Sequence, residues 1–305
     1  MPTEITVRTG DVPISVHDHG GDGPPVVLLH GAGGNLLAWH AVGPQLADAH
    51  RTIALDLRGH GRSGDGPWQW DAVLDDIEAV VAQLGLAAPA VVGHSLGGMI
   101  AGMWARRHPE CPAAVSLDGH RPALTSAEHY VDIPRDQLGR DLESLRTQFD
   151  AQTEAMAQPM SPAEVEAMLE GQRAAAAAAG ADEDAWLAMV RRGLRAKDGA
   201  TYLRPGRDVA DALRVAPEFL DALPVFSELD SPLLVVLATR DLPTLPSQFT
   251  ALLTALREGL RRDLAALADL RPQLHVREID ASHGMLAEEP NSVVTLVRDF
   301  VAAEH

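Results

Sequence analysis

Short apolar runs alternate with helix-like segments from residue 24 to residue 118. The runs are too uniformly apolar for half-exposed strands and are typical of strands buried on both faces. Alternation of such strands with helices indicates a parallel sheet, because parallel neighbours need long crossovers. The sequence therefore predicts an α/β fold with a doubly wound, mostly parallel sheet, whose ligands bind at the carboxyl ends of the strands. The expected strands are 24–31, 50–56, 88–93 and 112–118, and the expected helices are 36–49, 70–85 and 96–108.

The rest of the chain extends this pattern and interrupts it once. Alternation with period two on both sides of Gly10 and Asp11 predicts an opening hairpin. After Asp118 no convincing buried strand follows until residue 231, and the segment between has helical spacing broken by prolines. We therefore expect a core of residues 1–118 and 231–305 with an inserted helical cap, 119–230. The returning core elements are a strand in 231–241, a helix in 247–270, a strand in 273–280 and a helix in 292–304.

Composition excludes several classes of function. The formal net charge is −18, which argues against nucleic acid or an anionic membrane as a partner, because phosphate binding needs clustered cations. No stretch approaches the roughly 18 apolar residues of a membrane span, and the first residues do not resemble a signal peptide, so we expect a cytoplasmic protein. The single cysteine, Cys111, offers no disulfide and no metal-ligand spacing, and Lys197 is the only lysine, which disfavours Schiff-base and P-loop chemistry.

The segment Gly93-His94-Ser95-Leu96-Gly97 has the pattern G-x-S-x-G directly after a valine-rich strand and before an apolar helix. This pattern is typical of a nucleophile elbow, in which the strand turns abruptly into the helix and the serine hydroxyl is exposed at the tip. The N–H of Leu96 and the positive end of the helix dipole then face negative charge that develops on a substrate. The sequence predicts Ser95 as a nucleophile and Leu96 as an oxyanion donor.

Together with the segments 26–35, 54–64 and 279–290, this motif resembles the α/β-hydrolase superfamily, in the superfamily's order and on both sides of the insertion. The resemblance implies a serine hydrolase with a catalytic triad and a cap, and it implies a second oxyanion donor, the backbone N–H of Ala32. It also implies that His283, in "DASHGM", is the base. His94, His30 and His60 are interpreted as structural. No metal and no organic cofactor is expected.

The orienting carboxylate has two candidates. Asp241 follows the strand "LLVVLA" and gives the chain order Ser, Asp, His that this fold usually has. Asp118 ends the strand that follows the nucleophile helix, a position that some members of the superfamily use. Asp241 is the first choice and Asp118 the alternative.

A serine with two amide donors suits attack on an acyl carbon, so the predicted reaction is cleavage of a carboxylic ester or lactone of a hydrophobic, including a bulky, small molecule. The alternatives are a non-hydrolytic, carbon–carbon-cleaving or perhydrolase enzyme of the same fold, and a slow-turnover small-molecule receptor. The cap side chains that line the substrate pocket or form the cap core are Tyr130, Phe149, Met156, Met160, Met168, Trp186, Met189, Tyr202, Phe219 and Phe226.

Overall fold

The computed structural model describes residues 3–179 and 181–304, and the chain forms two compact units, each made of two segments. Unit 1 consists of residues 1–89 and 153–213, and unit 2 of residues 90–152 and 214–305. Both units contain sheet strands and part of segment 119–230. The boundaries expected for a core and a cap are therefore not those of the compact units, and the cap at 119–230 stays a prediction.

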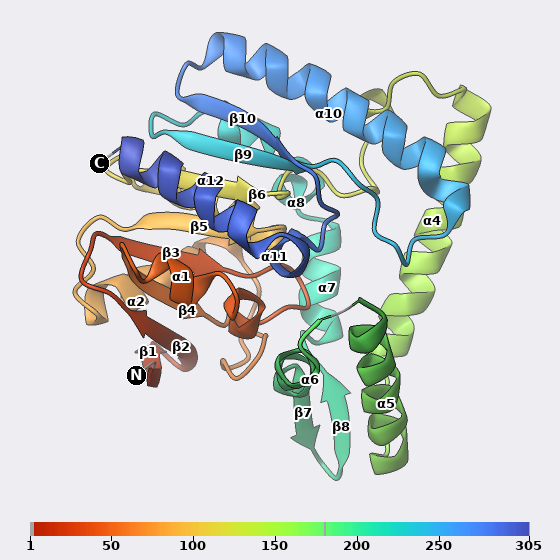
Figure 1. Cartoon of the computed structure of the whole chain (residues 1–305). Coiled ribbons are helices and arrows are strands. Elements are labelled where there is room, and N and C mark those ends of the chain that lie inside the picture. The colour runs from red at the N-terminus through yellow and green to blue at the C-terminus, as the bar shows by residue number, and fades with distance from the viewer. Residues whose placement is uncertain (1–2, 180, 305) are drawn as a thin grey trace. The chain divides into compact units, whose positions relative to one another are not determined.

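Unit 1 begins with the expected hairpin. Strand β1 pairs antiparallel with β2, β2 pairs antiparallel with β4, and β4 pairs parallel with β3. The strands are β1 (Thr3–Thr9), β2 (Val12–Gly20), β3 (Pro25–Leu29) and β4 (Arg51–Leu55) (Figure 1). Its helical elements are η1 (Leu36–Trp39), α1 (Gly43–Leu46), α2 (Trp70–Gln83), α5 (Pro162–Ala179), α6 (Glu183–Arg192) and α7 (Arg207–Arg214), whose last residue belongs to unit 2.

Unit 2 contains the parallel strands that carry the candidate site. The strand order is β5, β6, β9, β10, and every pairing among these four is parallel. The strands are β5 (Ala90–His94), β6 (Ala114–Leu117), β9 (Leu233–Ala238) and β10 (Leu274–Ile279) (Figure 1). The helical elements are α3 (Leu96–Arg107), η2 (Ala127–His129), α4 (Arg135–Met156, ending in unit 1), α8 (Pro217–Leu220), α9 (Leu223–Phe226), η3 (Ser247–Phe249), α10 (Thr250–Leu270), α11 (Met285–Glu288) and α12 (Pro290–Ala303).

The α/β class and the parallel strands confirm the expected fold, with two local differences. The helix expected over 36–49 is instead the short elements η1 and α1, because Gly43 and Pro44 interrupt it. The segment 119–230 is not wholly helical, since β7 (Leu194–Lys197) and β8 (Ala200–Leu203) form a hairpin. Its turn is Asp198-Gly199, with φ of 50° and 80°, and such an Asp-Gly pair is a strong hairpin signal that the sequence analysis missed.

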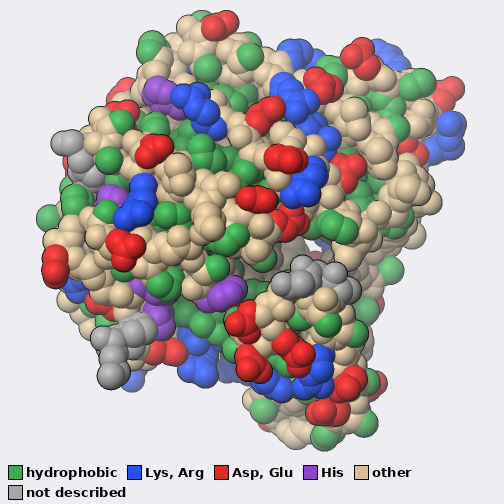
Figure 2. Space-filling view, viewed as in Figure 1, with side chains coloured by type: hydrophobic (Ala, Val, Ile, Leu, Met, Phe, Trp, Pro, Cys, Tyr) green, Lys and Arg blue, Asp and Glu red, His purple; other side chains and the backbone are tan. Residues whose placement is uncertain are grey.

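Among the described residues no helix is both long and apolar enough to cross a membrane. On the face drawn in Figure 2, basic side chains lie among acidic ones.

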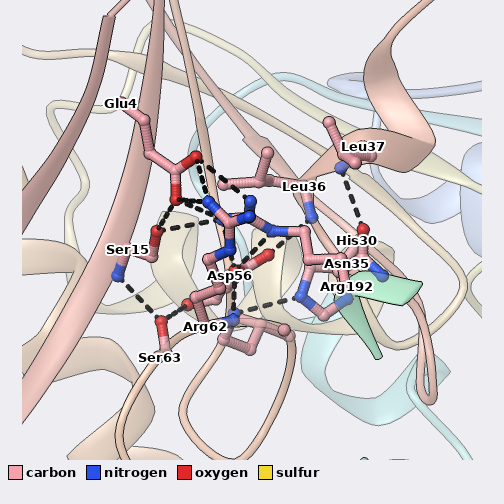
Figure 3. Close-up of polar contacts among 12 residues, drawn as sticks. Glu4, Ser15, His30, Asn35, Leu36, Leu37, Asp56, Arg62, Ser63 and Arg192 are labelled. Carbon is pink, nitrogen blue, oxygen red and sulfur yellow. Dashed lines mark hydrogen bonds and ion pairs between the residues drawn. The ribbon is translucent and has the colours of Figure 1, made fainter. Parts of the chain in front are cut away.

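A buried carboxylate organises unit 1. Asp56 follows β4 and has no exposed surface. It accepts hydrogen bonds from the backbone N–H of Leu36 and of Arg62, both at 2.7 Å, and from Arg192 Nε at 2.9 Å (Figure 3). Arg192 is the last residue of α6, so this carboxylate joins the loop after β3, the loop after β4 and α6 at one point.

The guanidinium of Arg192 also binds the N-terminal hairpin. Its Nη2 donates to Glu4 Oε1 and to Ser15 Oγ, both at 2.9 Å (Figure 3). The hydrogen bond from Arg192 lowers the pKa of Glu4 from 4.5 to about 2, against the opposing effect of burial. Because the folded-state pKa of Glu4 is lowered, its stabilising contribution is complete above about pH 4.5 and is lost as the pH falls toward 2.

Replacing Arg192 by methionine is expected to lower the free energy of unfolding by about 3 to 5 kcal/mol, because the substitution leaves the buried Asp56 charge without its cationic partner. The side chain of Arg192 is only 3% exposed and that of Asp56 is fully buried, so water cannot replace the lost contact. Urea denaturation followed by circular dichroism measures the change. The control is Arg191→Met on the exposed face of the same helix, and equal destabilisation by both variants would contradict this assignment.

Candidate active site

Ser95 lies at a sharp turn between β5 and α3. Its φ of 54° and ψ of −120° are sparsely populated for a residue with a side chain, so the surrounding structure must hold the turn in place. A Cβ atom on Gly93 would approach Gly97 O to 1.9 Å, which explains why a glycine stands two residues before the serine. The structure thus gives the segment the strand, turn and helix that a nucleophile elbow requires.

The turn after β6 supports this elbow from behind. A Cβ atom on Gly119 would lie 2.2 Å from Ser95 O, and a Cβ atom on Gly98 would lie 2.4 Å from Ser116 Oγ. Ser116 Oγ donates to Gly119 O at 2.7 Å, which fixes the same turn. No local pattern marks Gly98, Ser116 or Gly119, because their contacts join segments about twenty positions apart.

Strand register brings Ser95 and Asp118 to one edge of the sheet. His94 pairs with Leu117 between β5 and β6, and Leu117 pairs with Val236 between β6 and β9. The next residues continue this alignment, since Ser95 N–H donates to Leu117 O at 2.9 Å and Asp118 N–H donates to Val236 O at 2.8 Å. Both side chains therefore lie at the carboxyl end of the parallel strands, where ligands bind in open α/β sheets.

His283 is paired with Asp118. Its Nδ1 lies 2.6 Å from Asp118 Oδ2, and because a carboxylate only accepts, Nδ1–H is the donor. Burial alone would lower the pKa of His283, but the hydrogen bond and the negative charge of Asp118 raise it above the ordinary value. Burial would likewise raise the pKa of Asp118, yet the neighbouring His120 and His283 hold it well below its usual range. Asp118 is thus a carboxylate at neutral pH, and Nε2 is the nitrogen that carries no proton when the His283 ring is neutral.

Asp241, the first choice for the acid, does not contact His283 in this structure and forms an ion pair with Arg257 of α10. Thr239 N–H donates to Ile279 O at 3.1 Å and Arg240 N–H donates to Ala281 O at 3.0 Å, so the backbone continues alongside the residues that follow β10. Asp241 lines the same cavity but pairs with Arg257, and the alternative, Asp118, lies beside His283.

His94 contacts the backbone of His283. Its Nε2 lies 2.8 Å from His283 O, and a carbonyl oxygen only accepts, so Nε2 carries the proton. Burial, followed by the nearby His283, lowers the pKa of His94 to about 4, so the ring is neutral at physiological pH. His94 therefore supports the loop that carries His283, in keeping with the structural role expected for it.

The two predicted oxyanion donors lie in different units. Leu96 is the first residue of α3, where a backbone N–H has no acceptor within the helix. Ala32 lies in unit 1, in the turn after β3, where Gly34 N–H donates to Gly31 O at 3.0 Å. The roles of both amides stay predictions.

Two histidines of unit 1 contact backbone groups. His30 Nε2 accepts from Leu57 N–H, and His60 Nδ1 lies 3.0 Å from Arg58 O, so both rings bind backbone as structural histidines do.

A cavity of about 360 Å³ in unit 2 is lined by Ser95, Asp118 and His283. Most of its other lining residues are apolar, and many of these come from α4, α10 and the segment before α10. They are Met99, Pro122, Ala123, Leu145, Phe149, Phe219, Leu237, Ala238, Leu242, Leu245, Phe249, Leu253, Leu256 and Leu260. Phe149 and Leu242 are large apolar side chains that remain 47% and 39% exposed. Such exposure on a cavity wall indicates a surface that an apolar ligand covers.

Each arginine on the cavity wall has an acidic partner. Arg121 binds Asp221 and Asp263, and Arg257 binds Asp241. Arg240, also on the wall, is paired with Asp280 and Glu288. The positive charges are therefore already compensated, and the cavity favours a neutral ligand.

The aromatic and methionine side chains expected to line the substrate pocket or form the cap core lie in different surroundings. Phe149 and Phe219 line the cavity beside Ser95. Tyr130 and Phe226 are buried and belong to the packed interior of unit 2. Met156 and Tyr202 line a separate cavity of about 390 Å³ in unit 1, whose walls carry charges of both signs.

Comparison with known proteins identifies relatives for the whole fold. The family model described as alpha/beta hydrolase fold matches residues 24–290. The chain is 37% identical over 131 residues to the pimeloyl-[acyl-carrier protein] methyl ester esterase of Chromobacterium violaceum, covering 43% of this chain and 49% of the esterase. The chain spans between 27% and 56% of the length of the curated relatives it matches.

Two solved structures are similar over almost the entire chain. An E-2-(acetamidomethylene)succinate hydrolase superposes with a TM-score of 0.69 at 21% identity, covering 99% of this chain and 100% of the hydrolase. Est816, described as an N-acyl homoserine lactone degrading enzyme, superposes with a TM-score of 0.62 at 23% identity, covering 97% and 100% of the two chains. At these identities the likeness establishes the fold.

Proposed function

Because the chain belongs to the alpha/beta hydrolase fold family, we propose that it is a serine hydrolase that cleaves carboxylic esters or lactones with a neutral, apolar acyl group. The observation that carries the proposal is the hydrogen bond between His283 and Asp118 in a cavity that Ser95 also lines. These three residues are the nucleophile, base and acid of the proposed triad. The likeness to an esterase and to a lactone-degrading enzyme supports the reaction class.

The proposed reaction proceeds through an acyl-enzyme. His283 Nε2 takes the proton of Ser95 as Oγ attacks the acyl carbon, and the N–H group of Leu96 stabilises the oxyanion. Collapse of the tetrahedral intermediate breaks the bond to the leaving alcohol, which receives the proton from His283. Water then attacks the acyl-enzyme with His283 as base, releasing the acid and returning the proton to Ser95. Asp118 keeps the imidazole in the required tautomer and stabilises the imidazolium.

The cavity determines which acyl groups fit. Its wall is mostly apolar, with leucine the commonest residue, and its arginines are paired, so a charged acyl group would lose hydration without gaining a partner. A neutral acyl chain instead gains about 0.8 kcal/mol for each buried methylene. The proposed substrates are therefore neutral esters or lactones of apolar acids.

For a series of p-nitrophenyl esters, kcat/KM is expected to rise roughly fourfold with each methylene added to the acyl chain until the cavity is full. The matched control is a monoester of a dicarboxylic acid of the same chain length, which we expect to react at least tenfold more slowly. A fluorophosphonate should label Ser95 covalently, as mass spectrometry of the digest would show. Preference for the charged ester, or absence of both labelling and hydrolysis, would refute the proposal.

Activity is expected to increase with pH through an apparent pKa above 6.5, because Asp118 raises the pKa of His283 and the imidazole must be neutral to accept the Ser95 proton. Because Asp118 stabilises the protonated ring, the acidic limb of the pH profile shifts toward higher pH. The measurement is kcat/KM of a p-nitrophenyl ester between pH 5 and 9. A midpoint below 6.5 would contradict the raised pKa of His283.

A further inference from the structure

His120 occupies the second oxygen of the Asp118 carboxylate. Its Nε2 lies 3.0 Å from Asp118 Oδ1, while His283 takes Oδ2. The N–H of Ala238 also donates to Oδ1, at 3.0 Å. The carboxylate therefore has two donors on one oxygen and the His283 donor on the other.

The backbone fixes which nitrogen of His120 carries the proton. Arg121 N–H points at His120 Nδ1 at 2.7 Å, and a backbone N–H only donates, so Nδ1 is the acceptor. The proton of the neutral ring is then on Nε2, directed at Asp118. His120 Nδ1 also lies 3.1 Å from Arg121 O, but this longer contact would need a proton on the nitrogen that already accepts.

The surroundings hold this ring in position. The side chain of His120 is only 10% exposed, and His120 O accepts from Ala222 N–H at 3.0 Å. The next residue, Arg121, is 5% exposed and is held by Asp221 of the segment before α9 and Asp263 of α10. His120 and its neighbour Arg121 are thus anchored by the segment before α9 and by α10.

We propose that His120 is a positioning residue that fixes the Asp118 carboxylate and restrains its strength as an acceptor for His283. This role rests on the proposed function, in which Asp118 is the acid of the triad. With Oδ1 saturated by His120 and Ala238, the carboxylate cannot rotate away from His283. The donor on Oδ1 also withdraws charge from Oδ2, which limits how strongly Asp118 holds the imidazolium.

The other titratable and charged groups near Asp118, His120 and His283 also have identified partners. His94 contacts the backbone of His283, and Arg121 with its two carboxylates lies behind His120. Arg257 and Asp241 form a compensated pair on the cavity wall. These groups are unchanged in the variants below, so a change in the titration of His283 reports the loss of the His120 donor.

The test compares His120→Asn with His120→Gln. The Asn side chain can still accept from Arg121 N–H but is too short to reach Asp118, whereas the Gln amide extends to the position of Nε2 and restores a donor. Nuclear magnetic resonance titration of the His283 ring, identified by its loss in His283→Gln, is expected to show a pKa higher by about half a unit or more in His120→Asn. In His120→Gln the pKa should return to the wild-type value. His120→Leu also lacks a donor to Asp118 and should raise the pKa of His283 as His120→Asn does. It replaces His120→Asn in the test if His120→Asn does not fold.

An unchanged or lowered pKa of His283 in both His120→Asn and His120→Leu would overturn the proposal, as would failure of glutamine to restore the wild-type value. A purely structural role would reduce stability and kcat without raising this pKa. The titration needs no turnover, so it is independent of the reaction. If wild-type protein hydrolysed no ester while His283 titrated as expected, the proposed function would fail and the positioning role would stand.

Discussion

Replacing Ser95 by alanine is expected to reduce ester hydrolysis by about four or more orders of magnitude, because the nucleophile, base and acid act as one unit and nothing else supplies the attacking oxygen. The backbone turn is held by close contacts of Gly93, Gly98 and Gly119, none of which involves the serine hydroxyl. The fold should therefore survive, with circular dichroism and melting temperature close to wild type. The measurement is kcat/KM of the best ester from the chain-length series.

The control for this variant is Ser126→Ala, an exposed serine in the same unit that should leave turnover unchanged. Labelling by a fluorophosphonate should be lost in Ser95→Ala and retained in Ser126→Ala. Retention of more than about a tenth of wild-type turnover by folded Ser95→Ala would exclude Ser95 as the nucleophile.

The second large effect is expected from Asp118→Asn, with a loss of about 10⁴-fold in kcat. An amide at this position can present an N–H group to His283, which favours the tautomer that cannot take the serine proton. Asp241→Asn, the matched variant, should retain activity within about tenfold, since Asp241 contacts Arg257 and not His283. Both variants are isosteric, so the comparison isolates the charge and the hydrogen-bond direction.

The pH dependence of kcat/KM distinguishes the role of Asp118 from that of Asp241, whatever the size of the loss in kcat. Asp118→Asn removes the charge that raises the pKa of His283, so the acidic limb should shift to lower pH. Asp241→Asn should leave the limb in place. A large loss in Asp241→Asn with near-normal Asp118→Asn would mean that the chain after β9 moves to bring Asp241 to His283 during catalysis.

Local sequence was sufficient to predict the main strands and helices and the nucleophile elbow at Ser95. The buried strands are continuous apolar runs, and Gly93, Ser95 and Gly97 lie within five consecutive residues, so their geometry follows from one turn. The interruption by Gly43 and Pro44 and the Asp198-Gly199 hairpin are equally local, and attention to those residues would have predicted them. The parallel order of β5, β6, β9 and β10 also agrees with the expected fold.

The sequence by itself determined the fold class, the elbow serine and the candidate histidine, because each depends on short-range pattern and on strand order. Only the tertiary structure shows which of the two carboxylates, Asp118 or Asp241, contacts His283. Both follow buried strands, but Asp118 comes directly after β6 and lies 2.6 Å from His283 Nδ1, whereas Asp241 comes later after β9 and pairs with Arg257. Which carboxylate meets His283 thus depends on pairing between segments more than 160 residues apart, as the Asp118–His283 contact shows, and no local pattern encodes it.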